Sequence, residues 1–288
     1  MRTETPSAGA LESVRIDGRV DGVLAPLERG LHYGDGLFET IACLGGRPRF
    51  LERHLERLAY GCERLGIGFP GHEALGREIL AVAGEAERAV VKVLLTRGAA
   101  AARGYAVAGS ERPTRVTLRY RWEAEDPALA RDGVRVRMAE LRLGENPHLA
   151  GLKHLNRLEQ VEARREWSDP GIAEALMFSS SGRLVSGVMS NVFLVQAERL
   201  RTPRLDRCGV AGIMRAAVLR AAAQLGIAAE EAALDAGDLA QAREIFLTSA
   251  LIGVRPVREL AGRAVAPGPV TRALQQALAP LLAGAADA

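Results

Sequence analysis

The segment from Gly151 to Val161, with the sequence GLKHLNRLEQV, constrains the chain more than any other, because it sets a lysine into a regular apolar spacing. Apolar residues recur in it at every third position, at Leu152, Leu155, Leu158 and Val161. This spacing, after the break at Gly151, predicts a helix with one buried face and puts Lys153 in its first turn. There the unpaired backbone N–H groups and the helix dipole lower the pKa of a lysine, which can then attack a carbonyl group. A solvated lysine at a helix end is the alternative.

The composition limits the class of protein. The 288 residues, 48% of them hydrophobic and 25% charged, can bury one large core or two modest ones. No run approaches the ~18 apolar residues of a membrane span, and residues 1–9 lack the basic start and apolar centre of a signal peptide. We therefore expect a cytoplasmic protein with no membrane partner, and a disordered N-terminus over residues 1–12.

Cysteine content and charge narrow the possible partners. The three cysteines are too few and too far apart for a disulfide framework or a CxxC metal site, so no metal site is expected. The net charge is only +3, the arginines are spread along the chain, and aromatic residues make up 4% of it. These values argue against a nucleic-acid surface built on stacking. A small anionic molecule is the expected partner.

Turns, strands and helices alternate in the N-terminal half. A glycine turn at residues 33–36 precedes a strand, but its spacing is not GxGxxG and no strand-to-helix unit surrounds it, which excludes a Rossmann site. A helix from Phe50 to the stop at Gly66 carries Arg57 beside its apolar face. A buried-strand run at residues 89–96 then leads into a flexible loop of small residues between two arginines.

The polar, proline-containing stretch at residues 123–127 predicts a domain boundary. It separates a small N-terminal α/β domain, residues 13–123, from a large C-terminal domain, residues 124–288, that carries Lys153.

Two further features stand out in the C-terminal half. Residues 174–178 and 188–195 are predicted to be strands of a hairpin that turns near Ser181. A glycine turn then opens a helix at Ile213, and backbone amides at such a helix start, here those of Ile213 and Met214, form a ready phosphate site.

Several of these motifs, in this order, resemble those of the fold-type IV pyridoxal-phosphate (PLP) enzymes. The lysine segment is similar to the cofactor-lysine segment of 4-amino-4-deoxychorismate lyases, and residues 29–39 are similar to the signature R-x-x-x-x-G-D-G-x-F/Y-E. The resemblance extends from about Asp17 to Glu259. It implies the two-domain α/β architecture of D-amino-acid and branched-chain aminotransferases, with a smaller N-terminal and a larger C-terminal domain, and it implies a homodimer.

The resemblance also implies which residues bind the cofactor PLP. Lys153 would bind it covalently and, once released, would take a proton from the substrate as the catalytic base. The phosphate would be bound by Arg57, whose planar guanidinium suits it, by the amides of Ile213 and Met214, and by Ser249 at the end of a strand.

For the substrate, the most selective similarity is the spacing R-G-x-x-x-x-R-G-Y at residues 97–105, which looks like the lyase branch of the family. It implies that Arg97 and Arg103 bind the carboxylates of the substrate. Tyr105 and His32 are expected beside them.

One departure from the family pattern bears on the reaction. Family members have a glutamate five residues before the asparagine of the S/A-N-x-F strand, and it pairs with the ring nitrogen of PLP. Here Asn191 is that asparagine, the glutamate position is Ser186, and residues 179–193 hold no carboxylate. A neutral hydroxyl cannot keep the ring nitrogen protonated by charge, so the ring is a weaker electron sink.

A weaker sink should impair transamination more than an elimination that forms an aromatic ring. The sequence therefore favours a lyase that converts 4-amino-4-deoxychorismate to 4-aminobenzoate and pyruvate, for folate synthesis. A class IV D-amino-acid or branched-chain aminotransferase is the first alternative. A non-catalytic PLP-binding relic, in which Ser186 has replaced the glutamate, is the second.

Overall fold

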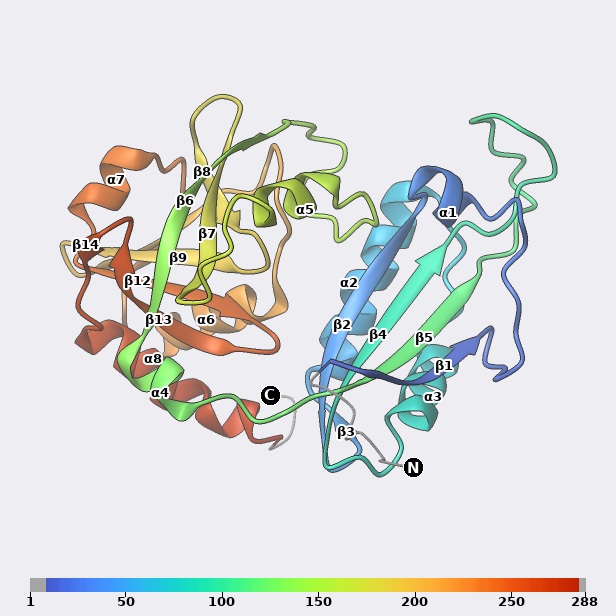
Figure 1. Cartoon of the computed structure of the whole chain (residues 1–288), viewed down its shortest axis with the longest axis horizontal. Helices are drawn as coiled ribbons and strands as arrows, with labels where there is room; N and C mark the ends of the chain where they lie inside the picture. Colours follow the sequence, from blue (N-terminus) through green and yellow to red (C-terminus); the bar gives the residue numbers. More distant parts are fainter. Residues whose placement is uncertain (1–8, 285–288) are drawn as a thin grey trace. The chain divides into compact units, whose positions relative to one another are not determined.

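The computed structural model describes residues 9–284, which divide into two compact units (Figure 1). Unit 1 holds the chain up to Ala124 together with Lys153–Asn156, and unit 2 holds Glu125–Leu152 and Arg157–Ala283. The lysine segment thus belongs to unit 1, which differs from its predicted place in a C-terminal domain. Of the N-terminus expected to be disordered, residues 1–8 lie outside the described residues, whereas residues 11 and 12 open a strand.

Unit 1 is built on an antiparallel sheet with the strand order β1-β5-β4-β2-β3. The strands are β1 (Leu11–Ile16), β2 (Gly36–Leu44), β3 (Arg47–Pro48), β4 (Arg88–Thr96) and β5 (Arg115–Arg121). The helices are α1 (Arg29–Tyr33), α2 (Leu51–Leu65) and α3 (His72–Ala83). The predicted stop of α2 is confirmed, since Gly66 caps the helix at φ 62°, a backbone conformation that glycine adopts without strain.

The core of unit 1 lies between the sheet and two helices. Residues of β4 alternate between buried and half-buried, as expected for a strand with one covered face. Helix α2 packs on β2, and α3 packs on β4 and β5, which accounts for the buried positions Leu55, Leu58 and Ile79. Strand β2 is thereby held firmly, and it carries the Phe38-Glu39 pair described below.

Unit 2 contains a mixed sheet with the order β11-β10-β9-β12-β13-β6-β7-β8, and β14 pairs with β13. Its strands are β6 (Val134–Leu143), β7 (Ile172–Ser179), β8 (Leu184–Gly187), β9 (Asn191–Gln196), β10 (Arg199–Pro203), β11 (Ala229–Ala232), β12 (Glu244–Ser249), β13 (Gly253–Leu260) and β14 (Arg263–Ala264). Its helices are α4 (Pro127–Asp132), α5 (Leu158–Arg164), α6 (Ile213–Gln224), α7 (Ala236–Gln241) and α8 (Pro269–Leu282).

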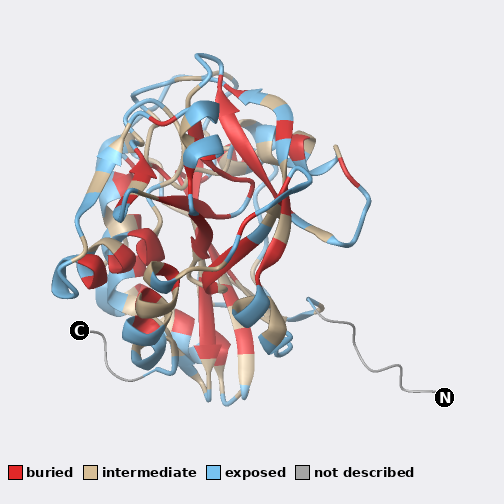
Figure 2. Cartoon of the chain, turned by 90° about the vertical axis from the view of Figure 1, so that its left-hand side faces the viewer, coloured by how far each residue is buried: buried red, intermediate tan, exposed pale blue. Residues whose placement is uncertain are grey.

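The central strands of unit 2 are buried over most of their length, as Figure 2 shows in red. Phe193 of β9 and Phe246 of β12 are paired across the ladder and stack with ring centroids 5.0 Å apart. Helices α6 and α8 pack against β12. Asn191 at the start of β9 and Thr248 near the end of β12, which pair with each other, are described with the candidate site below. No helix within residues 9–284 is long and apolar enough to cross a membrane.

The predicted hairpin in unit 2 is only partly correct. Its first strand, β7, pairs with β8, a strand that the prediction missed, whereas β9 pairs with β10 and β12. The chain leaves the β7 ladder after Gly187 because the carboxylate of Glu174 accepts hydrogen bonds from the backbone amides of Val188 and Met189.

Candidate functional site

Lys153 does not lie in a helix, which corrects the sequence prediction. Helix α5 begins only at Leu158, and residues 153–155 run extended beside β2. Phe38 donates its backbone N–H to the carbonyl of Lys153 at 2.9 Å, and Leu155 donates to the carbonyl of Gly36 at 2.9 Å. Leu158 is 72% exposed, so the three-residue spacing of leucines does not mark one buried face. The helix-dipole argument for Lys153 therefore does not apply.

The side chain of Lys153 is directed at an aromatic ring of the same unit. Its Nζ lies 4.2 Å from the centroid of the Phe38 ring, and Nζ of Lys92 lies 5.3 Å from that centroid. The amines of two lysines thus lie near one aromatic ring. Main-chain hydrogen bonds to β2 thus hold the backbone of Lys153 beside Phe38, and the amine lies over the Phe38 ring.

The residue after Phe38 forms a buried cluster of charged groups with α2. The Glu39 carboxylate, 1% exposed, accepts hydrogen bonds from Nδ1 of His54 at 2.6 Å and from Nε of Arg57 at 2.8 Å. Arg57 also donates through Nη2 to the second carboxylate oxygen. A two-point contact of this kind fixes the plane of a guanidinium as well as its position.

These contacts shift the ionisation of the cluster. Burial raises the pKa of Glu39, but the charges of Arg57 and His54 and their hydrogen bonds outweigh it and lower that pKa to about 2. Burial lowers the pKa of His54, against the attraction of Glu39. The cluster therefore holds an ionised Glu39 carboxylate against the Arg57 guanidinium at neutral pH.

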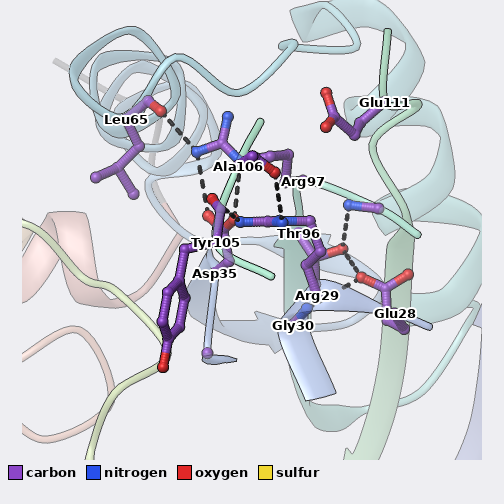
Figure 3. A network of polar contacts seen from close by, with 12 residues as sticks. Glu28, Arg29, Gly30, Asp35, Leu65, Thr96, Arg97, Tyr105, Ala106 and Glu111 are labelled. Atoms are coloured by element: carbon purple, nitrogen blue, oxygen red, sulfur yellow. Dashed lines mark hydrogen bonds and ion pairs between the residues drawn. The ribbon is translucent and has the colours of Figure 1, made fainter. Parts of the chain in front are cut away.

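Figure 3 shows where the structure places Arg97, predicted to bind substrate carboxylates. Its guanidinium donates to both carboxylate oxygens of Asp35, at 2.8 and 3.1 Å, and to the carbonyls of Leu65 and Gly66 at the end of α2. The side chain is buried. This arrangement gives Arg97 a structural role and argues against its predicted contact with substrate, because its hydrogen bonds are directed into unit 1.

The other predicted substrate residues lie at the surface of unit 1. Arg103 is exposed, and Tyr105 is 83% exposed with its ring 5.2 Å from that of Tyr33. His32 is exposed as well and donates from Nε2 to the carbonyl of Pro26 at 2.8 Å. The assignment of these residues to substrate binding stays a prediction.

In unit 2, the predicted phosphate site is the start of α6. Gly212 is the N-cap, and no side chain caps the amides of the first turn among the described residues. A Cβ at Gly212 would lie 2.0 Å from Oδ1 of Asn191, so a larger residue here would displace the Asn191 side chain. Asn191 is held in turn by a hydrogen bond from Nδ2 to the carbonyl of Val210 at 2.9 Å. Ile213 and Met214 open the helix at that point.

Strand β12 ends with two residues that carry hydroxyl groups, Thr248 and Ser249, next to β9. Ser249, predicted to bind phosphate, accepts a hydrogen bond from the amide of Ile252 at 3.4 Å. The preceding residue, Thr248, pairs with Asn191 in the ladder and is fully buried. Its Oγ1 has no hydrogen-bond partner among the residues that the structure describes. A buried hydroxyl without a partner is costly, which marks Thr248 as a candidate to bind a ligand atom.

Ser186 lies on β8 opposite Met177 and donates from Oγ to the carbonyl of Gly187 at 2.8 Å. The buried carboxylate of Glu174 accepts from three backbone amides and from Oγ of Ser190. Burial raises the pKa of Glu174 despite these hydrogen bonds. Glu174 therefore anchors the turn that leads to Asn191, and the sequence motifs did not single it out.

Sequence reasoning also missed Glu39, His54 and Thr248. Glu39 ends the motif at residues 29–39 and is the only charged residue in the otherwise uncharged run from Gly36 to Leu44, a signal that could have marked it as buried and paired. Nothing in the local pattern around Thr248 distinguishes it from Ser249.

The fold is shared with solved structures. The crystal structure of 4-amino-4-deoxychorismate lyase from Pseudomonas aeruginosa superposes with a TM-score of 0.88 at 45% identity, covering 92% of this chain and 97% of that one. A hypothetical aminotransferase from Mycobacterium tuberculosis, solved with alpha-ketoglutarate and PMP bound, superposes with a TM-score of 0.79 at 20% identity. That match covers 96% of this chain and 99% of that one, and at this identity it shows the fold alone. The architecture is the two-domain α/β fold of fold-type IV enzymes, as the sequence predicted.

The sequence places the chain in a family. The profile described as amino-transferase class IV matches residues 36–260. A curated relative, aminodeoxychorismate lyase from Vibrio harveyi, is 34% identical over 230 residues, which cover 80% of this chain and 84% of that protein. The chain belongs to the amino-transferase class IV family, and the resemblance inferred from its motifs is confirmed.

Proposed function

We propose that this protein is a PLP-dependent lyase that converts 4-amino-4-deoxychorismate to 4-aminobenzoate and pyruvate. The observation that carries the proposal is the placement of Lys153 by main-chain hydrogen bonds to β2, with its amine over the Phe38 ring. A lysine whose backbone is held in this way and whose amine lies against a ring suits covalent capture of an aldehyde. The similarity to proteins named as aminodeoxychorismate lyases, at 45% and 34% identity, supports the substrate.

The residues present suit PLP as the cofactor. Lys153 supplies the amine that would bind its aldehyde. The start of α6 supplies backbone amides that no side chain caps among the described residues, next to Gly212, whose lack of a Cβ makes room for Asn191. Thr248 offers a buried hydroxyl with no partner among the described residues. When bound, PLP would supply an electron sink for the carbanion formed at the substrate carbon that bears nitrogen.

Each residue has a distinct part in the proposal. Lys153, released from the cofactor, would take the proton from the substrate carbon that bears nitrogen. The bond between the ring carbon and the enolpyruvyl oxygen would then break as the ring becomes aromatic, and the departing enolate would take up one proton to give pyruvate. The phosphate would be bound by the amides of Ile213 and Met214, by Ser249 and by Arg57, whose plane Glu39 fixes. Asn191 would support the helix start through its contact with Val210.

Ser186 favours elimination over transamination in this proposal. Its hydroxyl is neutral and donates to the carbonyl of Gly187, so it brings no negative charge to a ring nitrogen. The aminotransferase alternative requires a stronger electron sink than such a residue supports. A homodimer, a role in folate synthesis and substrate contacts by Arg103, Tyr105 and His32 complete the proposal, and they come from the family resemblance. The proposed cytoplasmic location comes from the composition of the sequence.

The absorption spectrum of the purified protein with PLP, followed by addition of 4-amino-4-deoxychorismate with pyruvate release monitored in the same cuvette, tests the proposal. Lys153→Ala should abolish both the absorption band of lysine-bound PLP and pyruvate release. Lys92→Ala, which removes the second amine near the Phe38 ring, is the matched control and should keep the band. A band without pyruvate release would reject the lyase, and no band would reject the cofactor.

A further inference from the structure

The loop between β4 and β5, residues 97–114, is held by side chains at several points, although its composition predicts a flexible segment. Glu111 accepts hydrogen bonds from the backbone amides of Ala108 and Gly109, at 2.7 and 2.8 Å. The other anchor is an arginine from a distant part of the sequence. Both anchors bind backbone atoms, so they fix the path of the loop whatever its side chains are.

That arginine is Arg29 of α1, which is 4% exposed. Its Nη1 donates to the carbonyls of Gly104 at 3.3 Å and Ala106 at 3.2 Å, and its Nη2 donates to the carbonyl of Tyr105 at 3.2 Å. Three consecutive carbonyl groups thus point at one guanidinium. An arginine can serve them together because its donors are fixed in a planar fork, which a lysine lacks.

Arg29 is itself held in place by Asp35. Its Nε donates to Oδ2 of Asp35 at 2.8 Å, and Asp35 also binds Arg97 (Figure 3). Burial raises the pKa of Asp35, but the two guanidinium groups outweigh it and keep the carboxyl ionised. Arg97 ties the same carboxylate to the end of α2. The loop is therefore connected through Arg29 and Asp35 to the rigid part of unit 1.

The anchored carbonyls leave the loop side chains facing outward. Arg103 is exposed, and Tyr105 points away from the network in Figure 3. The Tyr105 ring contacts the Tyr33 ring at 5.2 Å, and the guanidinium carbon of Arg29 lies 5.2 Å from the centroid of Tyr33. Arg29 thus contacts the backbone of the loop tip directly and its aromatic side chain through Tyr33.

We propose that Arg29 is a positioning residue that presents Arg103 and Tyr105 in one arrangement to a substrate that carries carboxylates. The inference rests on the proposed function, in which these two side chains contact the substrate. Because the loop is ordered before the substrate binds, the entropy cost of ordering it does not reduce the affinity for the substrate. Loss of Arg29 therefore weakens substrate binding while the bond between Lys153 and PLP is unaffected.

Trypsin cleavage of the native protein tests the anchoring without any substrate. Arg103 is exposed and is followed by Gly104, so trypsin can cut this bond whenever the loop loosens. The wild-type bond should be cut at least about tenfold more slowly than in the unfolded chain, as for a site that is cut only on local opening. Arg29→Lys, which keeps the charge and loses the fork, should raise the native rate about tenfold.

The matched control is Arg97→Lys, since Arg97 shares Asp35 but makes its carbonyl contacts at Leu65 and Gly66 instead of residues 104–106. Equal acceleration in the two variants would overturn the proposal, because the loss of the Asp35 pair would then explain both. If Arg29→Lys fails to fold, as circular dichroism would show, the rate of trypsin cleavage after Arg103 in the native wild-type protein is the remaining test of the anchored loop. A native bond cut as fast as in the unfolded chain would also overturn it.

Steady-state kinetics with 4-amino-4-deoxychorismate test the substrate part. Arg29→Lys should raise KM about tenfold with a smaller change in kcat, and it should leave the absorption band of lysine-bound PLP unchanged. Faster trypsin cleavage with an unchanged KM would overturn the proposal, since the loop would then be held for stability only. Absence of pyruvate release by the wild type would instead reject the proposed function. The trypsin experiment would still test whether Arg29 anchors the loop.

Discussion

Arg57 donates to both carboxylate oxygens of Glu39, and this two-point pair lies at the interface of α2 and β2, directly after the residue whose ring faces the Lys153 amine. Glu39 is almost fully buried, so it neutralises Arg57 where water cannot. The pair joins a predicted cofactor contact to the strand that holds the lysine.

Glu39→Gln should destabilise the protein strongly, because the guanidinium of Arg57 would then be left without its buried counter-charge. We expect the free energy of unfolding at neutral pH to fall by about 3 kcal/mol, measured by urea unfolding. Glu56→Gln on the exposed face of α2, which breaks the Arg53 pair, is the control and should change it by less than about 0.5 kcal/mol. Similar losses in both variants would contradict the assigned role of Glu39.

Glu39 should also make stability depend on pH in acid. Its pKa is lowered from the ordinary 4.5 to about 2 in the folded chain. The folded state therefore binds fewer protons, and the Glu39 contribution is present above about pH 4.5 and is lost as the pH falls toward 2. The stability of the wild type should fall more steeply in this range than that of Glu39→Gln. Parallel curves would show that Glu39 has an ordinary pKa.

Gly212→Ala should disturb the start of α6, because the new Cβ would lie 2.0 Å from Oδ1 of Asn191. We expect a loss of about 1–3 kcal/mol in stability and about tenfold weaker PLP binding by spectroscopic titration. Gly76→Ala is a matched control in α3, where the Cβ would meet only a Leu55 methyl at 4.0 Å. This control substitution should raise the free energy of unfolding by about 0.5–1 kcal/mol. Unchanged PLP binding by Gly212→Ala would exclude this helix start as the phosphate site.

Thr248→Val should have opposite effects on the free protein and on cofactor binding. The buried Oγ1 has no partner among residues 9–284, so its removal should leave the stability without PLP unchanged or raise it by about 1 kcal/mol. PLP affinity should fall, since the ligand loses its hydrogen bond. Thermal unfolding with and without PLP measures both. Destabilisation in the absence of PLP would mean that the hydroxyl already has a partner in the free protein.

Ser186→Glu should give the protein a side activity. The added carboxylate would favour a protonated ring nitrogen and a stronger electron sink, so oxo-acid formation from D- or L-amino acids should rise. Ser186→Ala, which removes the hydroxyl without adding charge, is the control and should retain most of the pyruvate release. If Ser186→Glu gives no increase in oxo acid, then Ser186 does not explain a preference for elimination.

Local patterns predicted the elements well, and long-range contacts account for the errors. The stop of α2 at Gly66 and the buried run of β4 depend on neighbours in sequence, so their residue types suffice. The recurrence of leucines at every third residue predicts a helix at Lys153. Its backbone instead pairs with Phe38, more than a hundred residues earlier, and spacing within the segment contains no trace of that partner.

The same limit applies to the candidate site. Arg97 has the sequence context of an exposed loop arginine, yet it is bound by Asp35, which lies between α1 and β2, 62 residues away. The contacts of Arg29 could not be predicted from the sequence, because its partners are backbone carbonyl groups, which every residue carries. Motifs identified the lysine and the glycine turn correctly as features of a family, whereas the partners of each charged side chain emerged only from the fold.

The pairing of residues 153–155 with the start of β2 has a consequence beyond the position of the amine. Strand edges with free N–H and C=O groups are templates on which chains add to one another and aggregate. Here the edge next to Gly36 and Phe38 is covered by the protein's own lysine segment. A substitution that releases this segment would therefore expose an aggregation-prone edge and should reduce solubility along with activity.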